Sequence, residues 1–95
     1  MLRVLRTPLA EQDLAAIWSY IATDNVDAAD RMIRRLDERF RLLLKDPNMG
    51  DSMERYGTGL RATAVGPWVI YFRRTDVGIE VYRVLHGSQQ RGDHL

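Results

Sequence analysis

The sequence has 95 residues, a formal net charge of +1 and no cysteine. A chain of this length predicts one domain over residues 1–95, which buries about 60–68% of its unfolded surface. The missing cysteine excludes a disulfide framework, a thiolate metal site and a nucleophilic cysteine. No apolar run is long enough to span a membrane, and no signal-peptide core precedes residue 20, so we expect a cytoplasmic protein without a membrane partner.

Arginine dominates the basic residues, and the second half of the chain is mildly basic. Lys45 is the single lysine among the 14 basic residues. The stretch from Arg55 to Arg91 carries six arginines against two acids, Asp76 and Glu80. The planar guanidinium suits carboxylates, phosphates and base edges, so this half is a candidate binding region. Arginine-rich codon usage would account for the same composition.

The first half of the chain predicts a strand and a helix. Residues 2–6 alternate weakly around an apolar Val4 and indicate a short strand. Thr7-Pro8 indicates a helix start, because threonine can cap a helix and proline suits its first position. The helix is expected to end near residues 23–25. Its apolar stripe at helical spacing consists of Leu14, Ile17, Trp18 and Ile21.

A second helix is expected to begin near Asn25 or Asp27 and to stop at Pro47. Two apolar helices joined by a few polar residues form a helical hairpin, whose apolar seam requires a sheet or a partner to cover it. The stripe of this second helix consists of Ala29, Ile33, Leu36, Phe40, Leu43 and Leu44.

The remainder predicts a loop, three strands and a tail. Residues 48–59 are polar and contain three glycines, which indicates a loop. Residues 88–95 predict a flexible tail. The order is strand, helix, helix, then an antiparallel three-stranded meander, with the first strand at the sheet edge; this is an α+β fold (β-α-α-β-β-β). The three strand-like runs of the meander are residues 60–65, 68–72 and 79–85.

Five local strings occur in a fixed order along the chain. They are Thr7-Pro8-Leu9-Ala10-Glu11-Gln12-Asp13-Leu14, Ala28-Ala29-Asp30-Arg31, Pro47-Asn48-Met49-Gly50, Val65-Gly66-Pro67-Trp68-Val69-Ile70-Tyr71-Phe72 and Tyr82-Arg83-Val84-Leu85-His86-Gly87. In this order and spacing they resemble ParE-type toxins of the RelE/ParE superfamily, from about Leu5 to Gly87. One departure is Ser88-Gln89-Gln90, which stands where the family often has a charged ending.

The resemblance implies the toxin of a type II toxin–antitoxin system, of the kind that stabilises plasmids, without a cofactor. It implies a ParD-like antitoxin of ribbon-helix-helix type, in a heterotetramer of two toxins and two antitoxins. ParE members inhibit DNA gyrase and arrest growth, and the toxin alone is not expected to bind specific DNA sequences. Two alternatives stay open: a ribosome-dependent mRNA endoribonuclease of RelE type, and an inactive relative that only binds antitoxin.

The endoribonuclease alternative requires acid–base groups and cations around a phosphate. Arg61, Arg83 and His86 could supply them, but the predicted sheet contains no lysine. His86 is more simply interpreted as a strand-end residue that hydrogen-bonds a neighbour. The two histidines, His86 and His94, do not have metal-ligand spacing. The inhibitor hypothesis therefore assigns no catalytic residue and no metal.

The inhibitor hypothesis gives two groups of contact residues. By strand alternation Arg83 shares a face with Ile79, Val81 and Leu85, so it needs either a carboxylate distant in the sequence or a functional groove. Candidates for target binding are Arg61, Arg73, Arg83 and His86. Candidates for antitoxin binding are apolar residues that a small monomer cannot fully bury, with core packing as the alternative for the two tryptophans. They are Leu9, Trp18, Met32 and Trp68.

Overall fold

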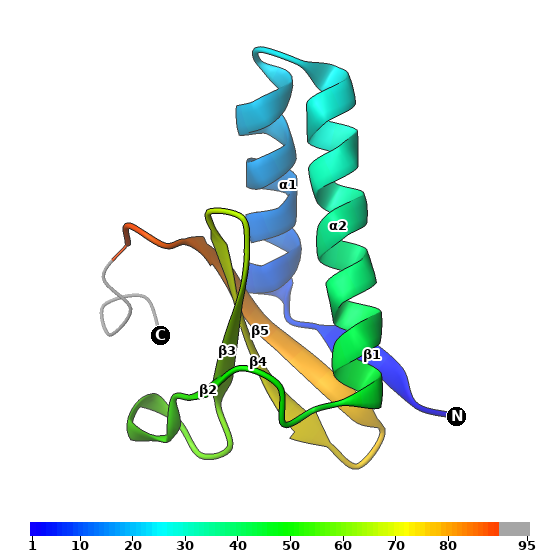
Figure 1. Ribbon diagram of the computed structural model, residues 1–95, viewed down its shortest axis with the longest axis vertical. Helices are drawn as coiled ribbons and strands as arrows, with labels where there is room; N and C mark the ends of the chain where they lie inside the picture. The colour runs from blue at the N-terminus through cyan, green and yellow to red at the C-terminus, as the bar shows by residue number, and fades with distance from the viewer. Residues whose placement is uncertain (90–95) are drawn as a thin grey trace.

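The computed structural model describes residues 1–89 and shows a helical hairpin packed on one face of a five-stranded sheet (Figure 1). This arrangement confirms the α+β prediction. No helix among the described residues is long and apolar enough to cross a membrane. The elements are β1 (Arg3–Arg6), α1 (Pro8–Ala22), α2 (Val26–Lys45), β2 (Asp51–Ser52), the 3-10 helix η1 (Glu54–Tyr56), β3 (Arg61–Val65), β4 (Trp68–Thr75) and β5 (Gly78–His86).

Both helices begin at side-chain caps, Thr7 as the sequence predicted and Asn25 at one of the two starts it left open. The hydroxyl of Thr7 accepts a hydrogen bond from the Ala10 N–H and donates one to the Tyr82 carbonyl, at 3.0 and 2.7 Å. The side chain of Asn25 accepts from the Ala28 N–H at 3.0 Å. Such caps satisfy donors that a helix leaves unpaired at its first turn. Thr7 therefore starts α1 and also fastens it to β5.

The sheet has the order β1-β5-β4-β3-β2, with β1 parallel to β5 and the other pairs antiparallel. The first strand thus lies at a sheet edge, as predicted. Gly78 pairs with Arg3 and has φ +142°, and a Cβ there would lie 2.1 Å from the Arg3 carbonyl oxygen. Only glycine allows β1 to approach β5 so closely.

A bulge in β5 overturns the predicted alternation around Arg83. Tyr71 of β4 pairs with Arg83, whereas Phe72 pairs with Val81, so one extra residue stands in β5. An extra residue reverses which side chains face which side of the sheet. Val84 consequently joins Ile79 and Val81 beneath the helices, and Leu85 packs in a cluster on the other face. The prediction that Arg83 shares a face with all three apolar residues was wrong.

The segment from 48 to 59 contains more structure than the predicted loop. Asp51 and Ser52 form β2 and pair with Ala62 and Arg61, and η1 follows. Gly50 has φ +85°, and a Cβ there would lie 2.2 Å from the Ala62 carbonyl oxygen. A two-residue strand has no periodicity, so the sequence carried no signal for it.

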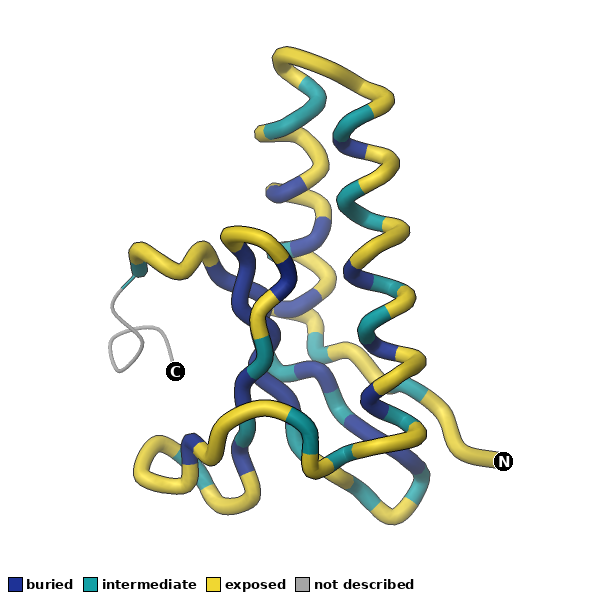
Figure 2. The backbone as a smooth tube through the Cα atoms, viewed as in Figure 1, coloured by how far each residue is buried: buried dark blue, intermediate teal, exposed yellow. Residues whose placement is uncertain are grey.

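Two clusters of buried residues lie on opposite faces of the sheet. The first fills the space between the hairpin and the sheet, and the helical turns near the α1–α2 linker extend beyond the sheet and are largely exposed (Figure 2). Its buried members are Ala10, Leu14, Ile17, Leu36, Phe40, Leu43, Val65, Trp68, Ile70, Phe72, Ile79, Val81 and Val84. The second consists of Met53, Leu60, Ala62, Val69, Tyr71 and Leu85.

Candidate functional site

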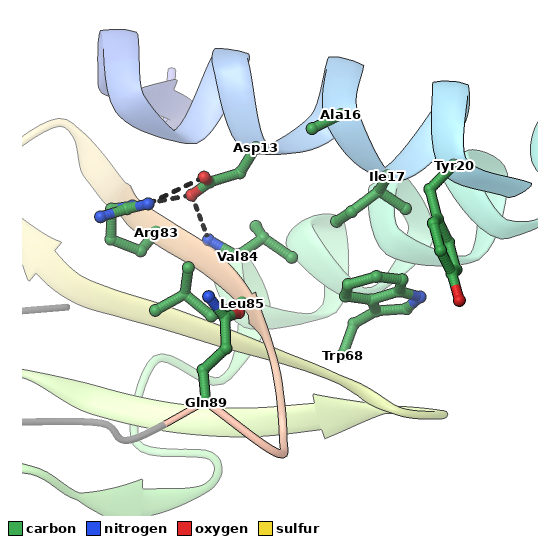
Figure 3. Close-up of a pocket in the computed structure, with 9 residues that line it drawn as sticks. All are labelled: Asp13, Ala16, Ile17, Tyr20, Trp68, Arg83, Val84, Leu85 and Gln89. Atoms are coloured by element: carbon green, nitrogen blue, oxygen red, sulfur yellow. Dashed lines mark hydrogen bonds and ion pairs between the residues drawn. The ribbon is translucent and has the colours of Figure 1, made fainter. Parts of the chain in front are cut away.

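A groove lies between α1 and the second half of β5 (Figure 3). It has a volume of about 260 Å³ and continues into a second hollow of about 380 Å³, with Tyr20 and Trp68 lining both. We call these two hollows together the α1–β5 groove. It brings together three residues that the sequence proposed as candidates: Trp68, Arg83 and His86. Its other lining residues are Asp13, Ala16, Ile17, Tyr20, Val84, Leu85, Ser88 and Gln89.

Asp13 closes one end of the α1–β5 groove and is the partner of Arg83. Its carboxylate accepts from Nε and one terminal nitrogen of Arg83, at 2.8 and 2.9 Å, and from the Val84 N–H at 2.9 Å. The two side chains are only 17% (Arg83) and 13% (Asp13) exposed. Because β1 ends opposite Val81, no strand of the described chain lies on that side of β5 beyond this point, while β4 continues along the other side to His86. Asp13 occupies this strand edge, as the N-cap Thr7 does six residues earlier.

The ion pair reinforces the charged state that an arginine already has at physiological pH. The hydrogen bonds to Asp13 raise the pKa of Arg83 above its ordinary value, and the lowering effect of burial is smaller. Arg83 therefore remains a cation over the whole physiological range and cannot exchange a proton with a substrate. Of the two possibilities left by the sequence, the carboxylate partner is present, 70 positions away in the chain.

Trp68 forms part of the groove floor and is only 9% exposed. Its indole Nε1 is buried without a hydrogen-bond partner, and its ring meets the His86 ring edge to face at 5.2 Å. A buried donor left unpaired costs about 1–3 kcal/mol. Trp18, in contrast, is 38% exposed, and its indole N–H donates to Asp30 at 2.8 Å. Trp18 is therefore not a core residue, whereas Trp68 is.

His86 is exposed at the end of β5, and apart from the ring contact with Trp68 its side chain bonds only to Ser88 among the described residues. Its Nδ1 lies 2.7 Å from the Ser88 hydroxyl and accepts from the Ser88 N–H at 3.1 Å. The backbone N–H of His86 donates to the Gln89 side chain at 2.7 Å. These bonds agree with the strand-end interpretation. Of the tail predicted over 88–95, the last six residues, including His94, lie outside the described part.

Arg61 and Arg73 lie away from the groove. The Arg61 guanidinium donates to the carbonyls of Asn48, Met49 and Gly50, at 2.6, 3.2 and 2.7 Å, and so fastens the segment after α2 to β3. Arg73 lies over the Tyr82 ring at 5.6 Å, and its Nε is buried without a partner. The four predicted target-binding residues therefore do not form one site.

The predicted antitoxin-binding residues also do not lie together at one site. Leu9 is 46% exposed and Trp18 is exposed, both on α1, while Met32 is half-buried against the first cluster. Sequence reasoning missed Asp13 and Tyr20, which line the groove. The sequence did contain a signal for Asp13, because its carboxylate stands between Ala10 and Ile17, at the edge of the apolar stripe of α1.

No group of three histidine or acidic side chains that could hold a metal ion occurs within residues 1–89. The three residues proposed for a nuclease do not converge either. Arg61 lines a different hollow, beside Pro47 and Asn48, while Arg83 and His86 lie in the two halves of the α1–β5 groove.

The fold, a strand and a helical hairpin on an antiparallel sheet, places the chain in a known class of small α+β proteins. A solved structure described as "Chromosomal ParDE TA system from P. aeruginosa" has this fold, with a TM-score of 0.74 and 22% identity; the match covers 90% of this chain and 96% of that one. The sequence also matches the model of a family described as "ParE toxin of type II toxin-antitoxin system, parDE" over residues 4–91. The chain therefore belongs to the ParE toxin family.

Two curated relatives come from Caulobacter vibrioides. Toxin ParE1 is 33% identical over 87 residues, which cover 90% of each chain. Toxin ParE3 is 28% identical over 94 residues, which cover 98% of this chain and 94% of the relative. The similarity thus extends over nearly the whole domain, as the strings quoted from the sequence indicated.

Proposed function

We propose that this toxin arrests growth by binding DNA gyrase, without catalysis of its own, and that a ParD-like antitoxin neutralises it. Membership of the ParE family supports the toxin role, and the name of the structural relative, a ParDE system, supports an antitoxin partner. We propose a ribbon-helix-helix antitoxin and a heterotetramer of two toxins and two antitoxins. Because gyrase acts in the cytoplasm, the proposal places the toxin there.

The main support for a toxin that is not an enzyme is that all three nuclease candidates are hydrogen-bonded to other groups of the protein. Arg61 donates to three backbone carbonyls, Arg83 is paired with Asp13, and His86 Nδ1 is bonded to Ser88. A nuclease needs an acid, a base and a cation directed at one phosphate. These side chains are directed at the protein instead, which favours a surface that acts by binding.

The test is a gyrase assay with purified toxin. Supercoiling and DNA cleavage are measured with gyrase from the same organism, with toxin alone and with toxin preincubated with the antitoxin encoded beside it. The expected result is accumulation of cleaved DNA that the antitoxin prevents. If gyrase is unaffected while the toxin still arrests growth, the gyrase proposal fails. Codon-phased mRNA cleavage on ribosomes would then support the RelE-type alternative, and absence of growth arrest would support the inactive relative.

A further inference from the structure

The α1–β5 groove contains a hydrogen-bond donor that the protein itself does not use. Trp68 is 9% exposed, and its Nε1 has no partner within the described part of the chain. The edge of the indole that carries Nε1 faces Tyr20 (Figure 3). Buried donors are nearly always paired, so an orphan at the floor of a groove points to an acceptor supplied from outside.

The Asp13–Arg83 pair and the backbone N–H groups of Val84 and His86 are already engaged. Val84 N–H and Arg83 both donate to Asp13, and His86 N–H donates to the Gln89 side chain. Two side chains thus stand where a partner strand would have to pair with β5. An additional strand would need to displace them, so a partner is expected to enter the groove with a side chain.

The walls of the groove suit an apolar side chain. Ile17, Tyr20 and the ring of Trp68 form one end, with the His86 ring perpendicular to that of Trp68. Ala16 is exposed and small, which lets a partner backbone approach α1. Tyr20 is 74% exposed, so its ring can turn aside without disturbing the core and uncover Nε1.

We propose that the α1–β5 groove receives one uncharged apolar side chain of the antitoxin, carried on a segment whose carbonyl oxygen accepts a hydrogen bond from Trp68 Nε1. The inference rests on the proposed function, in which an antitoxin is the partner. The unused donor requires an acceptor, and the neutralised Asp13–Arg83 pair leaves no charge for an ionic side chain to meet. The groove is therefore a specificity-determining contact between toxin and antitoxin.

The first test compares the two tryptophans. Binding of the antitoxin encoded beside the toxin gene is measured by calorimetry for the full chain and for Trp68→Phe and Trp18→Phe. Each substitution removes one indole N–H and keeps an aromatic ring. Trp68→Phe is expected to weaken binding about tenfold, as the loss of one buried hydrogen bond does, and Trp18→Phe to change it by less than about twofold. In the complex, the indole N–H resonance of Trp68 should shift downfield.

The second test fills the groove. Ala16→Arg places a long charged side chain in it, whereas Ala15→Arg adds the same side chain to α1 outside the lining residues. Ala16→Arg is expected to weaken antitoxin binding by about a hundredfold or more, because it blocks a central contact. Ala15→Arg is expected to weaken it by less than about threefold, because it changes only the rim. Circular dichroism and thermal unfolding of both variants verify that they fold.

The outcomes separate the two levels of the proposal. If the antitoxin does not bind the unmodified toxin, the proposed function fails and this inference fails with it. If the antitoxin binds but Trp68→Phe and Ala16→Arg bind as tightly as the unmodified chain, the inference alone is overturned. Stronger weakening by Trp18→Phe or Ala15→Arg would also overturn it, because the antitoxin would then cover the outer face of α1.

Discussion

The carboxylate of Asp13, in the second turn of α1, binds Arg83 of β5 from 70 positions away in the chain. The same carboxylate accepts the Val84 N–H, so one side chain fastens the helix to the sheet and covers an edge that β1 is too short to reach. The pair also forms one end of the α1–β5 groove. Stability and the proposed antitoxin contact thus depend on the same residue.

Asp13→Ala is expected to lower the free energy of unfolding by about 3 kcal/mol, because it leaves Arg83 and the Val84 N–H without their acceptor. Asp13→Asn retains a neutral acceptor and should cost about half as much. Urea unfolding of both variants provides the measurement. Equal and small losses, under about 0.5 kcal/mol, would show that the pair does not fasten α1.

The contribution of Arg83 to the free energy of unfolding is expected to be independent of pH between 7 and 10. The pKa of Arg83 is raised above its ordinary value by the hydrogen bonds to Asp13, so its stabilisation is complete below that ordinary value and is lost only as the pH rises through the still higher folded-state pKa. The difference in unfolding free energy between the unmodified chain and Arg83→Met, measured at both ends of this window, should agree within about 0.5 kcal/mol. A difference that shrinks toward pH 10 would contradict the pairing.

Gly78→Ala is expected to destabilise the protein by about 3 kcal/mol or more, because the added Cβ would clash with the Arg3 backbone at a strained positive φ. The matched control is Gly59→Ala, which has φ +73° but no atom within 4 Å of the new Cβ. Its cost should be about 1–2 kcal/mol, from the backbone conformation alone. Thermal unfolding distinguishes the two, and similar losses would mean that β1 does not approach β5 so closely.

Arg61→Lys is expected to cost about 2 kcal/mol, since one ammonium cannot reach the three carbonyls that the guanidinium binds. Amide hydrogen exchange should increase over residues 48–53 and remain unchanged in α1. If Arg61→Lys instead keeps its stability and loses gyrase inhibition, Arg61 contacts the target, as the sequence alone suggested.

Trp68→Phe is expected to change the free energy of unfolding by less than about 1 kcal/mol, because loss of packing volume is offset by removal of an unpaired donor. Trp68→Ala, which leaves a cavity in the first cluster, should cost about 3–5 kcal/mol. Both are measured by urea unfolding. A large loss in Trp68→Phe would mean that Nε1 has a partner, such as a bound water, in the free toxin.

Local signals in the sequence were sufficient for much of the fold. Thr7 and Asn25 cap the helices, and the apolar stripes and β-branched runs predicted two helices and four strands near their observed positions. Each of these signals depends on hydrogen bonds or side-chain periodicity within a few residues of the chain. The five family strings identified the toxin class for the same reason, since they are read directly along the sequence.

The tertiary structure decided the parts that depend on pairing between distant segments. One extra residue at the β5 bulge moved Val84 beneath the helices, and no periodicity could reveal it. Asp13 became the partner of Arg83 only because α1 lies along the exposed edge of β5. Residues far apart in the chain meet according to strand register and helix position, so the ion pair, the buried indole of Trp68 and the groove between them follow from the fold.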